Sequence, residues 1–274
     1  MLRLEGISKT YRVGTFGGRE LTAVRDVSFQ VRPGEVISLI GESGSGKSTI
    51  GRMVLRLTGV TAGTISFDGT DIAGFKGSGL RAYYGNVQGV FQDPFSCYNP
   101  VFKADRVLEM LRGPWFPGLD DRRWRDKVAA SLEAVRLDPA QVLGKYPHQL
   151  SGGQLQRLLV ARALLLDIRL LVADEIISML DASTRIDVLN LLGDLKARGL
   201  GILFITHDLS LGNYLSDQTV ILRRGEVVEQ GPTERVFGRP QHPYTRALLA
   251  SVPQLHRKWD RTGPVVGRAA GEGG

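Results

Sequence analysis

The apolar and polar side chains of this chain follow two different patterns, and each pattern predicts a kind of β-strand. Some segments alternate apolar and polar residues, as strands with one buried face do; these are Leu2–Ile7, Ala23–Val31 and Gly63–Gly69. Others are apolar throughout, as strands buried on both faces are; these are Val36–Ile40, Leu170–Ala173 and Ile202–Ile205. We expect the first group to form a small antiparallel sheet with Leu2–Ile7 at its edge. The second group should form a buried sheet.

Helical patterns separate the apolar strands along the chain. They cover Lys47–Leu57, Ala182–Ala197 and Ser210–Ser216. This alternation of strands and helices predicts an α/β core with a parallel sheet. A hairpin that turns at Arg224–Gly225 is expected to complete the sheet, and a short helix is expected at Thr245–Ser251.

The segment from Asp93 to Asp167 has a different character, because its strand patterns disappear. Two amphipathic helical stretches, Ala104–Leu111 and Asp121–Val135, are separated by the proline- and glycine-rich segment Gly113–Gly118. We therefore expect a helical insertion into the α/β core. At the other end of the chain, Gly263–Gly274 is rich in glycine and predicts a disordered terminus.

Composition excludes several classes of protein. Of the 274 residues, 42% are hydrophobic and 23% are charged, which is not the composition of a disordered, coiled-coil or collagen-like chain. Cys97 is the single cysteine, so an internal disulfide and a cysteine zinc cluster are excluded. No apolar run approaches the ~18–20 residues of a membrane helix, and Met1–Ser8 has no signal-peptide core, so we expect a soluble cytoplasmic chain. The net charge of +7 fits nucleic acid, an anionic membrane face, a phosphate ligand or simple solubility equally well.

A glycine-rich loop lies between an apolar strand and a helical pattern. Residues 41–48 (GESGSGKS) fit G-x-x-x-x-G-K-[ST] at every position and follow Val36–Ile40. The backbone N–H groups of such a loop converge on phosphate oxygens, and the helix N-terminus adds positive potential. We expect Lys47 to reach the terminal phosphates and the Ser48 hydroxyl to ligate Mg²⁺. The predicted nucleotide-binding residues are Gly41, Ser43, Gly44, Ser45, Gly46, Lys47, Ser48 and Thr49.

A second apolar strand ends in two carboxylates, Asp174 and Glu175. Beside a phosphate-binding loop, Asp174 can hold the Mg²⁺ shell, directly or through water. Glu175 can then orient or deprotonate the water that attacks the terminal phosphate. The pair therefore predicts nucleotide hydrolysis rather than binding alone.

A further glycine motif brings the sequence to a known family. Residues 150–157 (LSGGQLQR) resemble the signature of the ATP-binding cassette (ABC) ATPases. Other segments are similar to further motifs of that family, in its order. Gln92 resembles the glutamine loop, Ser178–Asp181 the D-loop, His207 the switch histidine and Tyr11 the aromatic residue that stacks on adenine. The resemblance covers about residues 2–253.

The resemblance implies an α/β fold with a P-loop NTPase (RecA-like) core, an antiparallel β subdomain and an inserted α-helical subdomain. It places the ABC ATPase domain at residues 1–253, with the core and β subdomain at about 1–92 and 168–235. The helical subdomain would take about 93–167, and residues 236–274 would form a C-terminal extension with a disordered end.

The family also implies roles for individual residues. Lys47, Glu175 and His207 would be catalytic, and His207 would hydrogen-bond the γ-phosphate. Gln92 would contact Mg²⁺, which gives Ser48, Gln92 and Asp174 as the metal residues. Nucleotide held by a second cassette would be contacted by Ser151, Gly152, Gly153 and Gln154, while Asp181 would cross the dimer interface. ABC cassettes commonly have proline after the catalytic glutamate, and Ile176 departs from this pattern.

Two segments are similar to one branch of the family, the oligopeptide and dipeptide importers. They are Phe91–Pro100 (FQDPFSCYNP) and the tail from Gly231 to Pro253 with its HPYTRALL stretch. The resemblance implies an ATP-hydrolysing importer subunit at the cytoplasmic face of the inner membrane. Its partners would be a second, often different, cassette, two permease subunits and, indirectly, an extracytoplasmic solute-binding protein. Phe95, Ser96, Tyr98 and Asn99 are candidates for the permease contact.

Two alternatives remain. The same branch is similar to the cassette ATPase of the soluble carbon–phosphorus lyase complex. The net positive charge alone suggests an ATPase of DNA repair or translation, but the twin cassettes, zinc cysteines and long coiled coils of those proteins are not evident. The imported solute, whether oligopeptide, dipeptide or oligosaccharide, is not encoded in these motifs, and no nucleic-acid partner is expected.

Overall fold

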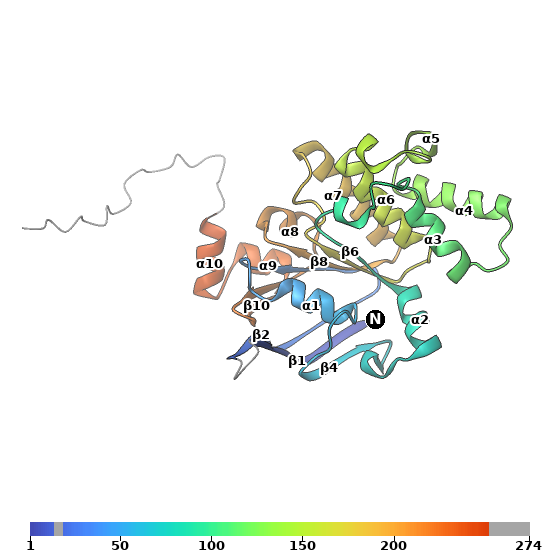
Figure 1. Cartoon of the computed structure of the whole chain (residues 1–274). Helices are drawn as coiled ribbons and strands as arrows, with labels where there is room; N and C mark the ends of the chain where they lie inside the picture. The colour runs from blue at the N-terminus through green and yellow to red at the C-terminus, as the bar shows by residue number, and fades with distance from the viewer. Residues whose placement is uncertain (14–18, 252–274) are drawn as a thin grey trace, which may run out of the picture.

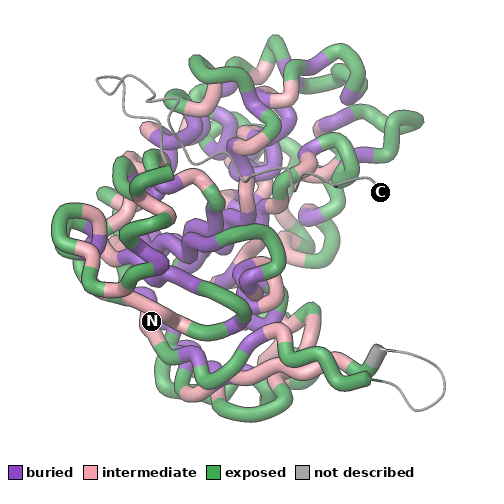
Figure 2. Tube along the Cα trace, turned by 90° about the vertical axis from the view of Figure 1, so that its left-hand side faces the viewer, coloured by how far each residue is buried: buried purple, intermediate pink, exposed green. Residues whose placement is uncertain are grey.

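The computed structural model describes residues 1–13 and 19–251. Figure 1 shows two β-sheets with helices between and around them, and the helices of the middle third of the chain gather at the top of that view. Buried residues concentrate in the centre of the molecule (Figure 2). The predicted α/β class is confirmed.

The smaller sheet is antiparallel and has the strand order β2-β1-β4-β5. Its strands are β1 (Leu2–Val13), β2 (Arg19–Val31), β4 (Ala62–Phe67) and β5 (Thr70–Asp71). Leu4 of β1 pairs with Phe29 of β2 on one side and with Ile65 of β4 on the other. The expectation that Leu2–Ile7 is an edge strand was therefore wrong. Alternation of apolar and polar residues indicates that one face of a strand is buried, but it does not indicate whether the strand pairs on one side or on both.

The larger sheet has the strand order β10-β9-β3-β8-β7-β6 and is parallel except for β10. Its strands are β3 (Val36–Ile40), β6 (Val87–Val90), β7 (Leu170–Asp174), β8 (Gly201–Thr206), β9 (Gln218–Arg223) and β10 (Glu226–Pro232). Strands β3, β7 and β8 are buried along their whole length, as their apolar patterns predicted. The hairpin that turns at Arg224–Gly225 is likewise confirmed.

The two faces of this sheet carry separate apolar clusters. Leu171 and Phe204 belong to a cluster with the helices of the upper layer, whereas Val172 and Leu203 belong to a cluster shared with the smaller sheet. Successive side chains of a strand point to opposite faces. A continuous apolar run is therefore what a strand covered on both faces requires.

The helices cover both faces of the larger sheet (Figure 1). They are α1 (Lys47–Val54), α2 (Gly77–Asn86), α3 (Arg106–Trp115), α4 (Asp121–Ala134), α5 (Pro139–Val142), α6 (Gly152–Leu164), α7 (Ala182–Ala197), α8 (Leu209–Leu215), α9 (Thr233–Gly238) and α10 (Pro243–Ala250). Helix α1 lies between the two sheets, and its Ile50 and Met53 are buried in the cluster that joins them. Helices α3 to α6 fall between β6 and β7 in the chain.

The predicted helices are present with small shifts at their ends, and α7 has the predicted bounds. Helix α2 and strand β6 were not predicted. The glycine-rich terminus 263–274 lies outside the described residues, so its predicted disorder stays a prediction. Within the described residues no helix is long and apolar enough to span a bilayer.

Candidate functional site

The glycine-rich loop turns tightly between β3 and α1 because its glycines are in close contact with neighbouring backbone. A Cβ on Gly41 would lie 2.2 Å from the carbonyl oxygen of Leu222. A Cβ on Gly46 would lie 2.6 Å from the carbonyl oxygen of Ala23, and Gly46 also has φ of 103°, in the region that favours glycine. These positions therefore exclude any side chain, which fixes the path of the loop.

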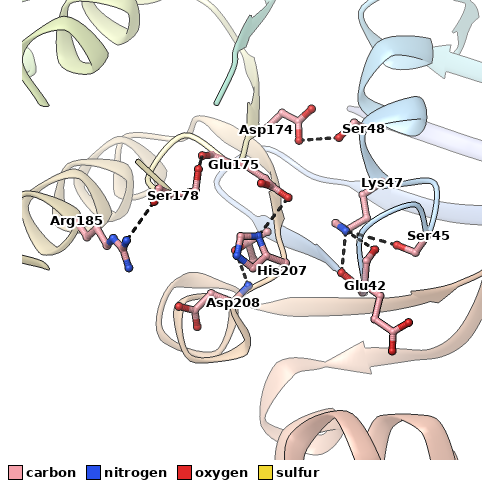
Figure 3. A network of polar contacts seen from close by, with 12 residues as sticks. Glu42, Ser45, Lys47, Ser48, Asp174, Glu175, Ser178, Arg185, His207 and Asp208 are labelled. Atoms are coloured by element: carbon pink, nitrogen blue, oxygen red, sulfur yellow. Dashed lines mark hydrogen bonds and ion pairs between the residues drawn. The ribbon is translucent and has the colours of Figure 1, made fainter. Parts of the chain in front are cut away.

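Lys47 folds back into this loop (Figure 3). Its Nζ donates hydrogen bonds to the carbonyl oxygens of Gly41 at 2.7 Å and Glu42 at 2.9 Å. Burial lowers the pKa of the Lys47 ammonium, and the carboxylates of Glu175 and Asp174 partly offset that effect. The chain thus keeps a buried cationic donor at the centre of the loop, which suits a bound phosphate group.

Ser48 and Asp174 bring two oxygen donors together beside Lys47. The Ser48 hydroxyl donates to Oδ1 of Asp174 at 3.2 Å. Burial raises the pKa of Asp174 and Glu175 adds to the rise, whereas the hydrogen bond from Ser48 opposes it. Among the described residues no group of three or more His, Cys, Asp or Glu side chains could hold a metal alone. A hydroxyl and one carboxylate nevertheless fit Mg²⁺, which takes few protein ligands and completes its shell with phosphates and water.

Glu175 follows β7 directly and has φ of 52°, a left-handed conformation that is uncommon for glutamate. Its backbone N–H donates to the Ile205 carbonyl oxygen at 2.9 Å, and its Oε1 lies 3.3 Å from Nδ1 of His207. Because β7 and β8 are parallel neighbours, the residues that follow them meet at one sheet edge (Figure 3). Five predicted site residues therefore converge here, namely Lys47, Ser48, Asp174, Glu175 and His207.

Two other predicted site residues lie at the margins of this cluster. Gln92 is exposed and follows β6, whose Val90 pairs with Ala173, so Gln92 emerges at the same sheet edge as Asp174. Tyr11 is half-buried in β1, and the Lys9 ammonium lies 5.1 Å from the centre of its ring. The adenine contact of Tyr11 stays a prediction.

The LSGGQ segment begins helix α6. The Ser151 hydroxyl accepts a hydrogen bond from the Gln154 N–H at 3.2 Å, and Oε1 of Gln154 accepts one from the Ser151 N–H at 2.9 Å. This reciprocal capping explains why a serine is followed three residues later by a glutamine at the start of α6. Within the described residues, 1–13 and 19–251, no hydrogen bond joins Ser151–Gln154 to the loop of Lys47. The segment is thus separate from the converged cluster within one chain.

Helix α7 packs directly against this segment. A Cβ on Gly153 would lie only 2.2 Å from Cγ2 of Thr184. Asp181 caps α7 by accepting hydrogen bonds from the Thr184 N–H at 3.0 Å and the Thr184 hydroxyl at 2.7 Å. Hydrogen bonds from Ser183 and Thr184 hold the pKa of Asp181 well below its usual value. The positions of Gly153 and Asp181 are therefore linked through one threonine.

Two family models match the sequence. The model described as ABC transporter matches residues 24–178, which is more than half of the chain. The chain belongs to the ABC transporter family. A second model, described as the C-terminal region of oligopeptide/dipeptide transporters, matches residues 228–272. Membership makes the chain an ATPase cassette, with ATP as its nucleotide.

Curated relatives are named for the transport or import of peptides or glutathione. The chain is 42% identical to a putative peptide import ATP-binding protein of Brucella ovis over 92% of this chain and 78% of that protein. It is 39% identical to a probable peptide ABC transporter ATP-binding protein of Sinorhizobium fredii over 92% and 72%. It is also 44% identical to the glutathione import ATP-binding protein GsiA of Escherichia coli, over 86% of this ABC cassette but 38% of GsiA.

Solved cassettes share the fold. One is a dimeric ATP-binding cassette in a post-hydrolysis state bound to ADP and Pi, with a TM-score of 0.75 and 27% identity, covering 85% of this chain and 99% of that one. Another is part of an ABC transporter complex from Clostridium perfringens, with a TM-score of 0.75 and 25% identity, covering 87% and 90%. The predicted ABC ATPase fold is confirmed.

The sequence analysis did not identify three residues that support the site. Arg185 donates to the carbonyl oxygens of Leu180 at 2.7 Å and Ser178 at 3.1 Å, which holds the turn after Glu175 (Figure 3).

The other two residues, Gln156 and Arg162, are polar and lie on the buried side of α6. Gln156 donates to the Phe91 carbonyl oxygen, and Arg162 donates to Oε1 of Gln88. In the sequence, such a residue is visible only as a polar position within an apolar helical pattern, and that pattern does not predict its hydrogen-bond acceptor.

Tyr98 corrects a sequence prediction about the permease contact. It was a candidate for that contact together with Phe95, Ser96 and Asn99, but it is buried, and its hydroxyl donates to the Leu155 carbonyl oxygen at 2.8 Å. Phe95, Ser96 and Asn99 are exposed as expected. Tyr98 instead ties the segment after Gln92 to helix α6.

Proposed function

We propose that this cassette is the ATP-hydrolysing subunit of an importer for oligopeptides, dipeptides or a related solute such as an oligosaccharide. Its relatives are named for peptide and glutathione import, and residues 228–272 match the C-terminal region of oligopeptide/dipeptide transporters. The observation that carries the proposal is the convergence of Lys47, Asp174, Glu175 and His207 at one sheet edge. That cluster supplies phosphate binding, a metal ligand and a base.

The proposed chemistry divides the work among these residues. The backbone N–H groups of the glycine loop and the Lys47 ammonium bind the β- and γ-phosphates. Ser48 and Asp174, with Gln92, would hold Mg²⁺, which neutralises charge on the transferred phosphoryl group. Glu175 orients the attacking water and accepts its proton, while His207 contacts the γ-phosphate. Tyr11 stacks on the adenine.

A second cassette is needed to complete this site. Ser151, Gly152, Gly153 and Gln154 begin helix α6, where free N–H groups favour an anion, but they do not contact their own chain's Lys47 loop. We propose that they bind the γ-phosphate held by a partner cassette and that Asp181 contributes to the same interface. Importers of this branch often pair two different cassettes, so we propose a heterodimer.

The membrane partners would bind near the segment after Gln92. Large apolar side chains are exposed here, at Phe95, Val101, Phe102 and Met110, and apolar surface of this kind marks interaction sites. We propose that two permease subunits dock on it at the cytoplasmic face of the inner membrane. The helical subdomain, at about 93–167, would move with them, whereas the core at about 1–92 and 168–235 holds the nucleotide.

Reconstitution tests the proposal. The full chain would be co-expressed with the permeases, partner cassette and solute-binding protein encoded beside it, and uptake of labelled di- and oligopeptides would be measured in vesicles. ATP-dependent uptake that is lost in Lys47→Ala supports the proposal, with Lys76→Ala, an exposed lysine, as the matched control. A chain that co-purifies only with soluble subunits would instead favour the carbon–phosphorus lyase type.

A further inference from the structure

Gln156 is a buried polar residue of α6 with an incomplete set of hydrogen bonds. Its side chain is fully buried, and its helix neighbours Leu155 and Leu158 belong to the apolar cluster of the upper layer. Its Nε2 donates to the Phe91 carbonyl oxygen at 3.4 Å, a long bond, and within residues 1–13 and 19–251 its Oε1 accepts none. A buried acceptor without a donor destabilises a fold, so stability does not explain a glutamine at this position.

The carbonyl group that Gln156 contacts belongs to the peptide that joins Phe91 to Gln92. Two residues earlier, Val90 ends β6 and pairs with Ala173, which directly precedes Asp174. Gln92 therefore leaves the larger sheet exactly where the chain passes to α6. The orientation of the Phe91–Gln92 peptide decides where the Gln92 side chain begins, and Gln156 holds that peptide.

The segment after Gln92 is held by the same helix. The Tyr98 hydroxyl donates to the Leu155 carbonyl oxygen at 2.8 Å, in the residue next to Gln156. The chain between Gln92 and Tyr98 is a tight turn, in which Oδ1 of Asp93 accepts from the Phe95 N–H at 2.9 Å. Residues 91–98 are thus tied to α6 at both ends, with Gln92 between the two contacts.

Helix α6 also carries the LSGGQ segment, whose last residue, Gln154, lies two residues before Gln156. Successive turns of an α-helix are hydrogen-bonded to one another, so these residues move as one body. A displacement of Ser151–Gln154 toward nucleotide on a partner cassette therefore carries Gln156 with it, and the Phe91 carbonyl oxygen follows.

We propose that Gln156 is a positioning residue for Gln92, which it ties to α6 through the Phe91 carbonyl oxygen. The placement of Gln92 beside Asp174 thereby depends on where the LSGGQ helix lies. This inference rests on the contact of Gln92 with Mg²⁺, which is part of the proposed function. It links the segment that faces a partner cassette to the metal contact of the chain's own site.

Gln156→Met tests this link, because methionine fills a similar volume and lacks the amide donor. The matched control is Gln141→Met, at an exposed position of α5. In urea unfolding of the full chain, Gln156→Met should leave stability unchanged or slightly raised, since it removes the buried acceptor that has no donor. A residue that serves only the stability of the fold would lose stability instead.

Steady-state kinetics are measured on the full chain assembled with its partner cassette. Gln156→Met should lower kcat by about 3- to 10-fold, the effect of losing one hydrogen bond. KM for ATP should change little, because the loop of Lys47 is untouched, and Gln141→Met should match the wild type. A wild-type kcat in Gln156→Met would overturn the inference.

A double-mutant cycle with Gln92→Ala shows whether Gln156 acts through Gln92. If it does, Gln156→Met should cause no further loss of kcat once Gln92 is replaced. Independent losses that add would contradict the inference and leave the proposed function standing. If Gln92→Ala alone has no effect, the proposed role of Gln92 at the metal fails, and the inference fails with it.

A measurement without turnover follows the segment itself. Cys97 is the single cysteine and is exposed, so a spin label attached there reports on the mobility of residues 91–98. In the nucleotide-free chain, Gln156→Met should raise the mobility of the label, whereas Gln141→Met should not. An unchanged spectrum in Gln156→Met would show that this hydrogen bond does not hold the segment, which would also overturn the inference.

Discussion

Nδ1 of His207 lies 3.3 Å from Oε1 of Glu175. The two residues follow neighbouring parallel strands, and the Glu175 N–H is hydrogen-bonded to Ile205 on the strand that leads to His207. The side-chain contact therefore rests on the backbone register of β7 and β8. It means that the proposed base and the proposed γ-phosphate contact are held as a pair.

Glu175→Gln should separate nucleotide binding from hydrolysis. The substitution keeps the shape of the side chain but removes its ability to accept a proton, and a positioned base contributes about 10²–10⁴-fold to such a step. Single-turnover hydrolysis should therefore fall by at least about 100-fold, while ATP·Mg²⁺ affinity stays near that of the wild type. Glu133→Gln, at an exposed position of α4, is the matched control. Hydrolysis at the wild-type rate in Glu175→Gln would remove this residue from its catalytic role.

The contact between Glu175 and His207 should appear as energetic coupling. In a double-mutant cycle of Glu175→Gln and His207→Ala on hydrolysis, the losses should not add, and residues in contact typically couple by about 0.5–3 kcal/mol. His207→Ala combined with Glu133→Gln should be additive. Simple additivity in both cycles would show that the two side chains act independently.

Gly153→Ala should destabilise the chain because the new Cβ meets Thr184 Cγ2 at 2.2 Å. Thr184 cannot turn away, since its hydroxyl is hydrogen-bonded to Asp181 at 2.7 Å. Overpacking of this kind costs about 1–3 kcal/mol in the free energy of unfolding, measured with urea. Gly152→Ala is the control, because its Cβ would have no neighbour closer than 3.6 Å.

Removing Cγ2 of Thr184 tests whether that contact is the cause of the predicted destabilisation. Thr184→Ser deletes Cγ2 and keeps the hydroxyl for Asp181, so the double variant Gly153→Ala/Thr184→Ser should recover most of the lost stability. If the serine gives no recovery, the clash lies elsewhere and the close approach of α6 and α7 does not explain the glycine.

Glu229 predicts a pH dependence of stability. Burial by itself would raise its pKa, but several hydrogen bonds, two of them from the N–H groups of Gln241 and His242, lower it, and the net pKa is below its usual value. A carboxyl group whose pKa is lower in the folded state stabilises the fold above its unfolded pKa, and that stabilisation is lost as the pH falls through the folded pKa. The window for Glu229 therefore lies below pH 4.5.

Glu229→Gln should accordingly reduce the free energy of unfolding by about 1–2 kcal/mol at pH 7. The difference from the wild type should shrink as the pH falls below about 4.5. Urea unfolding at several pH values measures it. Glu226→Gln, on the same strand, removes only an exposed ion pair with Arg25 and should change stability by less than about 1 kcal/mol. A difference at Glu229 that does not vary with pH would contradict the argument.

The strongly patterned elements were predictable because burial on both faces leaves a continuous apolar run, as in β3, β7 and β8. Strand β6 (VQGV) was missed because it is short and contains glutamine and glycine, yet it is paired along its whole length with β7. Helix α2 was missed for a similar reason, since three glycines interrupt its pattern and only Tyr83 of its side chains is buried.

The sequence motifs predicted which residues form the site, but not their hydrogen bonds, backbone conformation or burial. The motif of the glycine loop names Lys47, whereas its hydrogen bonds to Gly41 and Glu42 depend on how the loop closes. The left-handed conformation of Glu175 cannot be inferred from a strand pattern, and neither can the burial of Tyr98. The burial of Tyr244 was even less accessible, because its packing with Ile40 and Ile221 joins segments that only the folded sheet brings together.

Strand β3 sits between β8 and β9, so Val36 pairs with Ile202 and Ile37 pairs with Gln218. The complete glycine motif is therefore synthesised long before the strands that flank it. A growing chain that has emerged from the ribosome only as far as α7 carries Lys47 and Glu175 but has no strand to hold β3 in place. Pairing between such distant segments is slow to form. We therefore expect the capacity to bind ATP to arise late in synthesis, once β8 and β9 can pair with β3.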